Sequence, residues 1–152
     1  MTKKIEIDAP GPAEAMIWKD VPLPEPDATE VTIRHSYVGL NYIDTYHRTG
    51  LYPLPMPSGI GMEGSGVVTK LGKSVVMFKE GDRVAYGLGP PGSYSEERNI
   101  DQSKLIKIPD FLEEREASSI MLQGMTVEYL LERTFKVKES HTVLVHAAAG
   151  GV

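Results

Sequence analysis

The sequence contains no cysteine among its 152 residues. This absence excludes disulfides, thiolate nucleophiles, iron–sulfur clusters and every zinc site with cysteine ligands, and it fits a reducing cytosol. Long apolar runs are also missing, because no stretch approaches the roughly 18 residues that a membrane helix needs. The two N-terminal lysines are not followed by the apolar segment of a signal peptide. We therefore expect a cytoplasmic protein with no membrane partner.

Positive charge is scarce as well. Sixteen basic residues stand against 21 acidic ones, which gives a formal net charge of -5, and the longest basic stretch is the triplet at 136–138. This balance argues against nucleic acid and anionic membranes as partners. A chain of this length holds one ordinary domain, or one domain with a fragment of a second, but is too short for a complete two-domain enzyme.

Frequent glycine and proline divide most of the chain into segments too short for long helices. The chain has 15 glycines and 11 prolines, and the alternating runs between them predict strands. The predicted strands cover residues 3–7, 16–21, 30–37, 64–71, 82–86, 93–98 and 104–108. Seven short strands without a long helix between them favour an antiparallel barrel or sandwich. Proline-rich segments at 23–27 and 51–57 predict surface connections and a stiff loop.

The pattern changes to helix after Pro109. Asp110 is a candidate N-cap, with Glu113 at the position that completes a capping box. Apolar residues then recur at helical spacing over 127–135, which predicts an amphipathic helix that needs a covering partner. An apolar run at 142–146 predicts a buried parallel strand, and it enters a glycine-rich turn at 147–152. Such a turn either cradles a pyrophosphate through Ala149, Gly150 and Gly151 or is an ordinary loop.

Six sequence blocks occur in order along the chain: NYIDTY at 41–46, RTGLY at 48–52, GMEGSGVV at 61–68, GDRV at 81–84, QGMT at 123–126 and HAAAGGV at 146–152. Together they resemble the zinc-independent NADPH:quinone oxidoreductases, or zeta-crystallin-like proteins, of the medium-chain dehydrogenase/reductase superfamily. The resemblance covers the whole chain but only the first half of such an enzyme.

The resemblance implies a mainly β, α+β fold with two parts. Residues 1–124 would form a GroES-like, barrel-type substrate and catalytic domain, and residues 125–152 the opening helix and strand of an incomplete Rossmann cofactor domain. The rest of the cofactor domain, which would hold most of the NADPH and form a homodimer in the parent protein, is absent. We therefore expect the 152-residue chain alone to be inactive, with an apolar tail that is disordered, exchanged between chains or self-associating.

The resemblance also implies that the zinc site is lost. In zinc-dependent relatives a cysteine stands at Asn41 and a histidine at Met62, and both bind the metal. A neutral amide and a thioether are poor ligands for Zn²⁺. Catalysis would then depend on how the protein positions cofactor and substrate.

Several residues are implied to line the cleft that faces the nicotinamide. They are Asn41, Asp44, Tyr46, Arg48 and Tyr52, with Thr126 reaching the nicotinamide side from a helix and Ala149, Gly150 and Gly151 at the phosphates. The catalytic candidates are Asn41, Tyr46 and Tyr52, because tyrosine rings can stack on a quinone and their hydroxyls can donate to its oxygen.

Structural interpretations compete with these roles. The tyrosines could be packing residues, Asp44 and Arg48 a surface ion pair at helical spacing, and Glu63 a carboxylate satisfied by backbone N–H groups. The four histidines show no metal-ligand spacing, which favours structural roles.

Three functions remain open at this stage. The parent protein transfers hydride from NADPH to a quinone without a metal, reduces the C=C bond of an enal or enone with the same architecture, or contains a GroES-like binding module without turnover.

Overall fold

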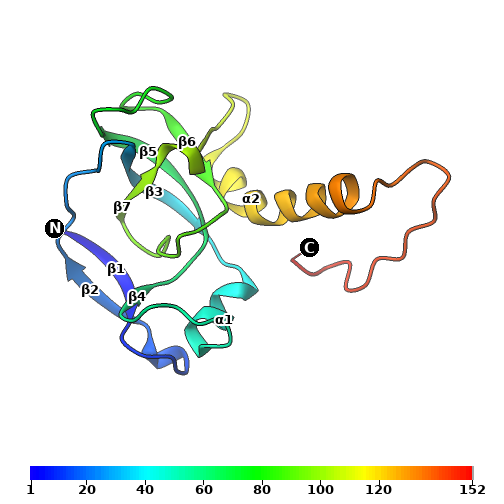
Figure 1. Cartoon of the computed structure of the whole chain (residues 1–152), viewed down its shortest axis with the longest axis horizontal. Helices are drawn as coiled ribbons and strands as arrows, with labels where there is room; N and C mark the ends of the chain where they lie inside the picture. The colour runs from blue at the N-terminus through cyan, green and yellow to red at the C-terminus, as the bar shows by residue number, and fades with distance from the viewer. Residues whose placement is uncertain (152) are drawn as a thin grey trace.

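The computed structural model describes residues 1–151. Val152, the last residue of the predicted glycine-rich turn, lies outside the described residues. Two antiparallel sheets form the body of the molecule, and a helix and an extended segment project from it (Figure 1). This arrangement confirms the mainly β, α+β fold class predicted above.

A five-stranded sheet forms the larger layer. Its strands occur in the order β7-β3-β5-β6-β8. Their bounds are Glu30–Gly39 for β3, Glu63–Leu71 for β5, Arg83–Tyr86 for β6, Glu97–Asp101 for β7 and Ile106–Lys107 for β8. Two irregularities in the β3–β5 register, at Thr32/Ile33 and at His35/Tyr37, bend the long central pair. All four pairings are antiparallel, as the short connections predict.

A smaller, three-stranded sheet has the order β2-β1-β4, with β1 at Thr2–Ile7, β2 at Ile17–Val21 and β4 at Ser58–Gly59. A 3-10 turn at Ala13–Ala15 joins β1 to β2, and another at Gln102–Lys104 joins β7 to β8. The two-residue β4 was not predicted, because two residues after a proline-rich loop carry no alternating pattern.

The predicted strand at 93–98 is wrong over most of its length, because β7 begins only at Glu97. The preceding residues bridge the two layers instead: Tyr94 donates its N–H to the Ile60 carbonyl at 3.1 Å, and its own carbonyl accepts from the Ile5 N–H at 2.7 Å. These contacts use the backbone groups that a strand of the larger sheet would need.

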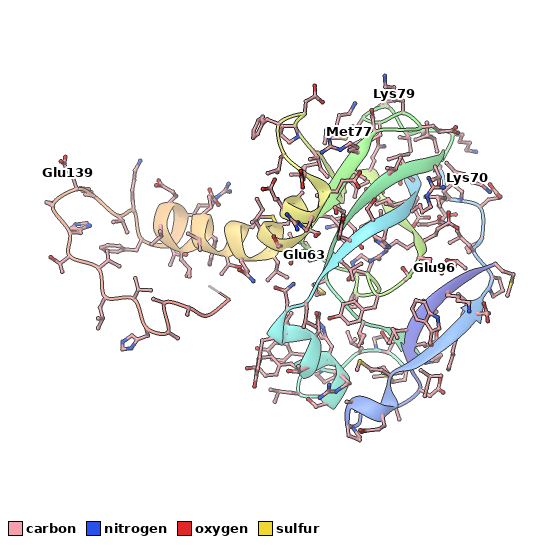
Figure 2. All side chains as sticks on the ribbon, turned by 180° about the vertical axis from the view of Figure 1, so that it is seen from behind. Glu63, Lys70, Met77, Lys79, Glu96 and Glu139 are labelled. Atoms are coloured by element: carbon pink, nitrogen blue, oxygen red, sulfur yellow. The ribbon has the colours of Figure 1, made fainter. Side chains whose placement is uncertain are left out.

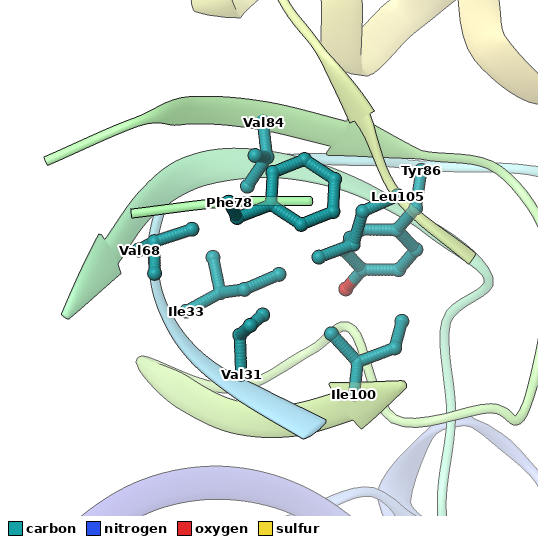
Figure 3. Packing of buried hydrophobic residues seen from close by; sticks show 8 residues of the cluster. All are labelled: Val31, Ile33, Val68, Phe78, Val84, Tyr86, Ile100 and Leu105. Carbon is teal, nitrogen blue, oxygen red and sulfur yellow. The ribbon is translucent and has the colours of Figure 1, made fainter. Parts of the chain in front are cut away.

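The main core lies inside the larger sheet, where alternate residues of neighbouring strands meet (Figure 3). It contains Val31, Ile33, Val68, Phe78, Val84, Tyr86, Ile100 and Leu105, all nearly inaccessible to solvent. A second cluster of Ala85, Ile108 and Ala117 fixes the first turns of the long helix to the sheet. Burial of these apolar side chains is the main stabilising term of the fold.

The long helix α2 spans Glu114–Glu128. The predicted capping box at Asp110 and Glu113 is wrong by one turn: Glu113 is the N-cap, and its N–H donates to the Glu116 carboxylate at 3.0 Å. A turn closed by the Leu112 N–H and the Pro109 carbonyl precedes the helix and delays its start. The helix passes through Gly124 without a break.

Beyond α2 the chain loses its packing partners. A π-helical turn continues the helix over Tyr129–Thr134, and the remaining residues run out to one side before turning back (Figure 1). The strand predicted at 142–146 does not form in the described structure, because a strand requires a hydrogen-bonded neighbour and none lies beside this segment. Its apolar side chains Val143, Leu144 and Val145 are 50 %, 79 % and 60 % exposed.

Candidate active site

A short helix, α1 at Tyr42–Thr49, carries most of the predicted site residues. Asn41 is its N-cap, and the Asn41 N–H donates to the Asp44 carboxylate at 3.0 Å, as expected for an acidic residue in a first turn. The helix ends at Gly50, whose left-handed backbone (φ 80°) favours glycine. Local sequence signals therefore fix both ends of the segment that presents the site.

Asn41 is buried and bound to Glu63 from the start of β5. Its Nδ2 donates to Glu63 Oε2 at 2.7 Å, and the other carboxylate oxygen, Oε1, accepts the N–H of Leu122 in α2 at 2.9 Å. Glu63 is only 1 % exposed and lies where the larger sheet meets α2 (Figure 2). Glu63 is thus satisfied by a backbone N–H, and it also contacts a predicted catalytic residue.

Asp44 is buried beside Asn41 and has a partner that the sequence analysis missed. The Tyr94 hydroxyl donates to Asp44 Oδ2 at 2.7 Å, and burial together with this carboxylate raises the pKa of Tyr94. The other oxygen, Oδ1, is buried without a hydrogen-bond partner in the described chain. The sequence contains no local signal for Tyr94, which lies 50 residues from Asp44.

Tyr46 and Tyr52 come together at the end of α1. Their ring centroids are 5.2 Å apart in an edge-on arrangement, and Tyr42 packs on Tyr46 at the same distance. The Tyr52 N–H donates to the Tyr46 carbonyl, which fixes the loop after α1. Tyr52 is 49 % exposed, so this aromatic cluster is an accessible surface and not part of the core.

The alternative interpretation of Asp44 and Arg48 as a surface ion pair is wrong, because no ion pair joins them among the residues that the structure covers. The Arg48 Nε and the His47 Nδ1 are instead buried without partners, like Asp44 Oδ1. Three unsatisfied polar atoms on one helix are unusual, because buried polar atoms are almost always paired.

Thr126 lies on α2, apart from α1. Its hydroxyl donates to the Leu122 carbonyl at 2.8 Å, so it is connected to Asn41 only through Leu122 and Glu63. Ala149, Gly150 and Gly151 are exposed and form no strand–turn–helix unit. Both glycines lie against Gln123, Gly124 and Val127, around a cavity of about 240 Å³. The structure therefore brings together the α1 residues and Tyr52, links Thr126 to them indirectly, and leaves the glycine turn separate.

His35 is a structural residue in the larger sheet. Its Nδ1 lies 2.7 Å from the Ser95 carbonyl, which can only accept, so Nδ1 donates and Nε2 accepts from the Tyr86 hydroxyl at 2.7 Å. Burial lowers the pKa of His35 to about 4, with Arg98 acting in the same direction. The neutral imidazole connects β3 to β6 and to the Ser95 loop.

Within residues 1–151 no three histidine, cysteine, aspartate or glutamate side chains are grouped as metal ligands would be. Met62 lies against the loop at Gly89. No helix of the described chain is long and apolar enough to cross a membrane.

Comparisons with known proteins identify the family and the fold of this chain. Residues 27–110 match the family model described as the alcohol dehydrogenase GroES-like domain. A quinone oxidoreductase of Pseudomonas aeruginosa is 46% identical over 153 residues, which cover 100% of this chain and 47% of that protein. The chain thus spans about half the length of the curated relatives it matches.

Two solved structures are also similar. The crystal structure of a quinone oxidoreductase from Pseudomonas syringae superposes with a TM-score of 0.96 at 46% identity, covering 99% of this chain and 47% of that one. The Escherichia coli quinone oxidoreductase complexed with NADPH gives 0.87 at 37% identity, with coverages of 90% and 42%.

Proposed function

Because the chain belongs to the family of alcohol dehydrogenase GroES-like domains, we propose that it supplies the substrate side of a cleft in which hydride passes from NADPH to a quinone. Support for the chemistry comes from the relatives named quinone oxidoreductases and from the NADPH complex of one of them. The whole protein that contains this chain would carry out the reaction. In this proposal residues 1–124 form the substrate domain, and residues 125–152 begin the cofactor domain.

The observation that carries the proposal is the junction of two surfaces at α1. On one side lie buried polar groups with unused hydrogen-bonding capacity, Asp44 Oδ1 and Arg48 Nε. On the other lies the accessible pair of Tyr46 and Tyr52. A nicotinamide ring with its carboxamide needs both a flat apolar face and polar partners, and so does a quinone with two carbonyl oxygens. The α1 residues offer both kinds of group, which supports the proposal.

Bound NADPH supplies the hydride, and the residues of this chain position the reactants. Asn41, Asp44, Arg48 and Thr126 would hold the cofactor side, with Asp44 Oδ1 accepting an amide N–H and Arg48 Nε donating. Ala149, Gly150 and Gly151 would approach the phosphates once a cofactor domain surrounds them. The Tyr46 and Tyr52 hydroxyls would donate to the quinone oxygen that gains negative charge, which stabilises the transition state more than the ground state.

No metal step is needed in this mechanism. The donor atoms at Asn41 and Met62 are an amide and a thioether, which do not fit a catalytic zinc site. The Asn41 amide nitrogen is also engaged by Glu63. Two donated hydrogen bonds would then take the role that a Lewis acid has in metal-dependent carbonyl reduction.

Steady-state assays of the whole protein test this function. We expect saturable NADPH oxidation with benzoquinones or naphthoquinones and much slower turnover with alkenals. Replacing the hydroxyls in Tyr46→Phe and Tyr52→Phe should lower kcat for the quinone, by about 100-fold for a donor that contacts the oxygen. Tyr129→Phe, at an exposed tyrosine outside the site, is the matched control and should leave kcat unchanged.

Two results would contradict the proposal. Faster turnover of alkenals than of quinones would identify a C=C reductase instead. Absence of turnover with both substrate classes and with either nicotinamide cofactor would favour a binding module. We also expect the 152-residue chain alone to show no NADPH oxidation, because relatives of this chain are about twice its length; saturable turnover by the purified chain would disprove that expectation.

A further inference from the structure

We propose that Glu63 is a positioning residue that sets the relative placement of the two sides of the cleft, Asn41 on α1 and Thr126 on α2. This inference rests on the function proposed above, but its structural part can be tested separately. We call the set of Asn41 Nδ2, the Glu63 carboxylate and the Leu122 N–H the Glu63 bridge. It consists of the two hydrogen bonds of 2.7 Å and 2.9 Å that meet at one carboxylate.

The first argument is continuity. Thr126 donates its hydroxyl to the Leu122 carbonyl, Leu122 donates its N–H to Glu63, and Glu63 accepts from Asn41. Two residues proposed to contact the same cofactor, 85 positions apart in sequence, are thereby joined by a short series of hydrogen bonds. A change in the length or direction of the Glu63 side chain must shift one end relative to the other.

The second argument is burial. Glu63 is 1 % exposed, and both of its oxygens face donors. An ionised carboxylate accepts at both oxygens and therefore matches two donors, whereas no other side chain of the same shape does so. The orientation of the Asn41 amide follows from this match, because only its nitrogen can face the carboxylate. Glu63 thus fixes the Asn41 amide with its nitrogen toward the carboxylate and its oxygen pointing away.

The third argument is close packing around the bridge. A Cβ atom on Gly39, at the end of β3, would collide with the Glu63 carboxylate and with the Ser118 carbonyl of α2. A Cβ on Gly87 would similarly approach the Leu122 nitrogen to 2.7 Å. The two glycines let the strands approach α2 closely enough for the bridge to form.

The informative variant is Glu63→Gln, which keeps shape but replaces one acceptor oxygen with an NH₂ group. The NH₂ group of the glutamine must then face either the Asn41 amide nitrogen or the Leu122 N–H, and both of these groups are donors. Adding Asn41→Asp restores complementarity, because the new glutamine can donate to the new aspartate and accept from Leu122, and the net charge returns to that of the original pair. Glu116→Gln, in the capping box of α2, removes one carboxylate charge without contacting the bridge and serves as the control.

The structural readout is amide hydrogen exchange in the 152-residue chain, taken as a ratio of Leu122 to Ile33 in the core. Glu63→Gln should speed exchange at Leu122 by tenfold or more beyond any change at Ile33. The double variant should restore protection, and Glu116→Gln should leave the ratio unchanged. A proportional change at both amides, or no change, would overturn the bridge. If the double variant loses as much protection at Leu122 as Glu63→Gln does, the bridge is overturned as well.

The functional readout is the kinetics of the whole protein with NADPH and a benzoquinone. Displaced cofactor contacts should raise KM for NADPH and lower kcat/KM by about 10- to 100-fold in Glu63→Gln. If Glu63 had a merely structural role, the variant would contain less folded enzyme, so its apparent kcat would fall and its KM for NADPH would stay unchanged. That result would overturn the proposal. If the unaltered protein fails to reduce quinones, the proposed function fails, while the exchange ratio still decides whether the bridge exists.

Discussion

The body of the molecule, residues 1–128, and the C-terminal segment, residues 129–151, both contain regularly spaced apolar residues but differ in what covers them. In the body, alternate side chains of β3, β5 and β6 meet in one core and are almost fully buried. In the C-terminal segment Leu130, Leu131 and Phe135 are 42 %, 40 % and 62 % exposed. An apolar pattern thus indicates a face that requires a partner, and only the fold shows whether the partner is present.

The largest expected difference between the two regions is the effect of losing one leucine side chain. Leu105→Ala, in the core, should lower the free energy of unfolding by about 2–5 kcal/mol, because it removes buried methyl groups and leaves a cavity. Leu144→Ala, at a 79 % exposed position, should change it by less than about 0.5 kcal/mol. Urea denaturation of both variants measures these values. Equal losses would show that the C-terminal segment is packed.

A second difference between the two regions is how a histidine in each affects the dependence of the free energy of unfolding on pH. The pKa of His35 is lowered to about 4 in the fold, from an ordinary value of about 6.5, so the unfolded chain binds a proton that the folded chain excludes. The free energy of unfolding should therefore fall as pH falls from about 6.5 to 4, by up to about 3 kcal/mol, and change little on this account above that range.

Denaturation across this pH range, compared with His35→Phe, measures the contribution. The variant should lose this pH dependence, whereas His141→Phe in the C-terminal segment should retain it. Identical pH profiles for the original chain and His35→Phe would contradict the assigned role.

The smallest expected effects come from two glycines. Gly39→Ala should destabilise the fold by about 1–3 kcal/mol, because the added methyl meets the Glu63 carboxylate and the Ser118 carbonyl. Gly124→Ala, in α2 with nothing within 4 Å of the added atom, should stabilise it by about 0.5–1 kcal/mol through helix propensity. Thermal unfolding of the two variants in parallel should give shifts of opposite sign. An unchanged or raised melting temperature for Gly39→Ala would show that the strand–helix contact at Gly39 is looser than described.

Sequence reasoning predicted what depends on local periodicity. Alternation located β1, β3 and β5 nearly to the residue, and the helical spacing of Asp44 and Arg48 agrees with their place in α1. Proline spacing located the loop before β4. These features depend on residues close in the chain, so their patterns can be read without the fold.

Contacts between distant segments could not be predicted in the same way. The Glu63 carboxylate meets Leu122 across 59 residues, and Tyr94 meets Asp44 across 50. The strand expected at 142–146 fails for a related reason, since its apolar run describes a buried strand but cannot supply the neighbouring strands. The candidate site was therefore identified through its residue types and its resemblance to a family, whereas its hydrogen-bond network required the structure.

Residue-by-residue amide hydrogen exchange of the 152-residue chain tests the central claim most directly, namely that an ordered body holds the α1 site while Val143, Leu144 and Val145 form no strand within the described residues. We predict that the amides of Ile33, Val84 and Leu122 exchange only through global unfolding. Those of Val143, Leu144 and Val145 should exchange at nearly the rate of an unstructured peptide. Protection of these three valine and leucine amides at the level of the core, or rapid exchange at Leu122, would contradict the account.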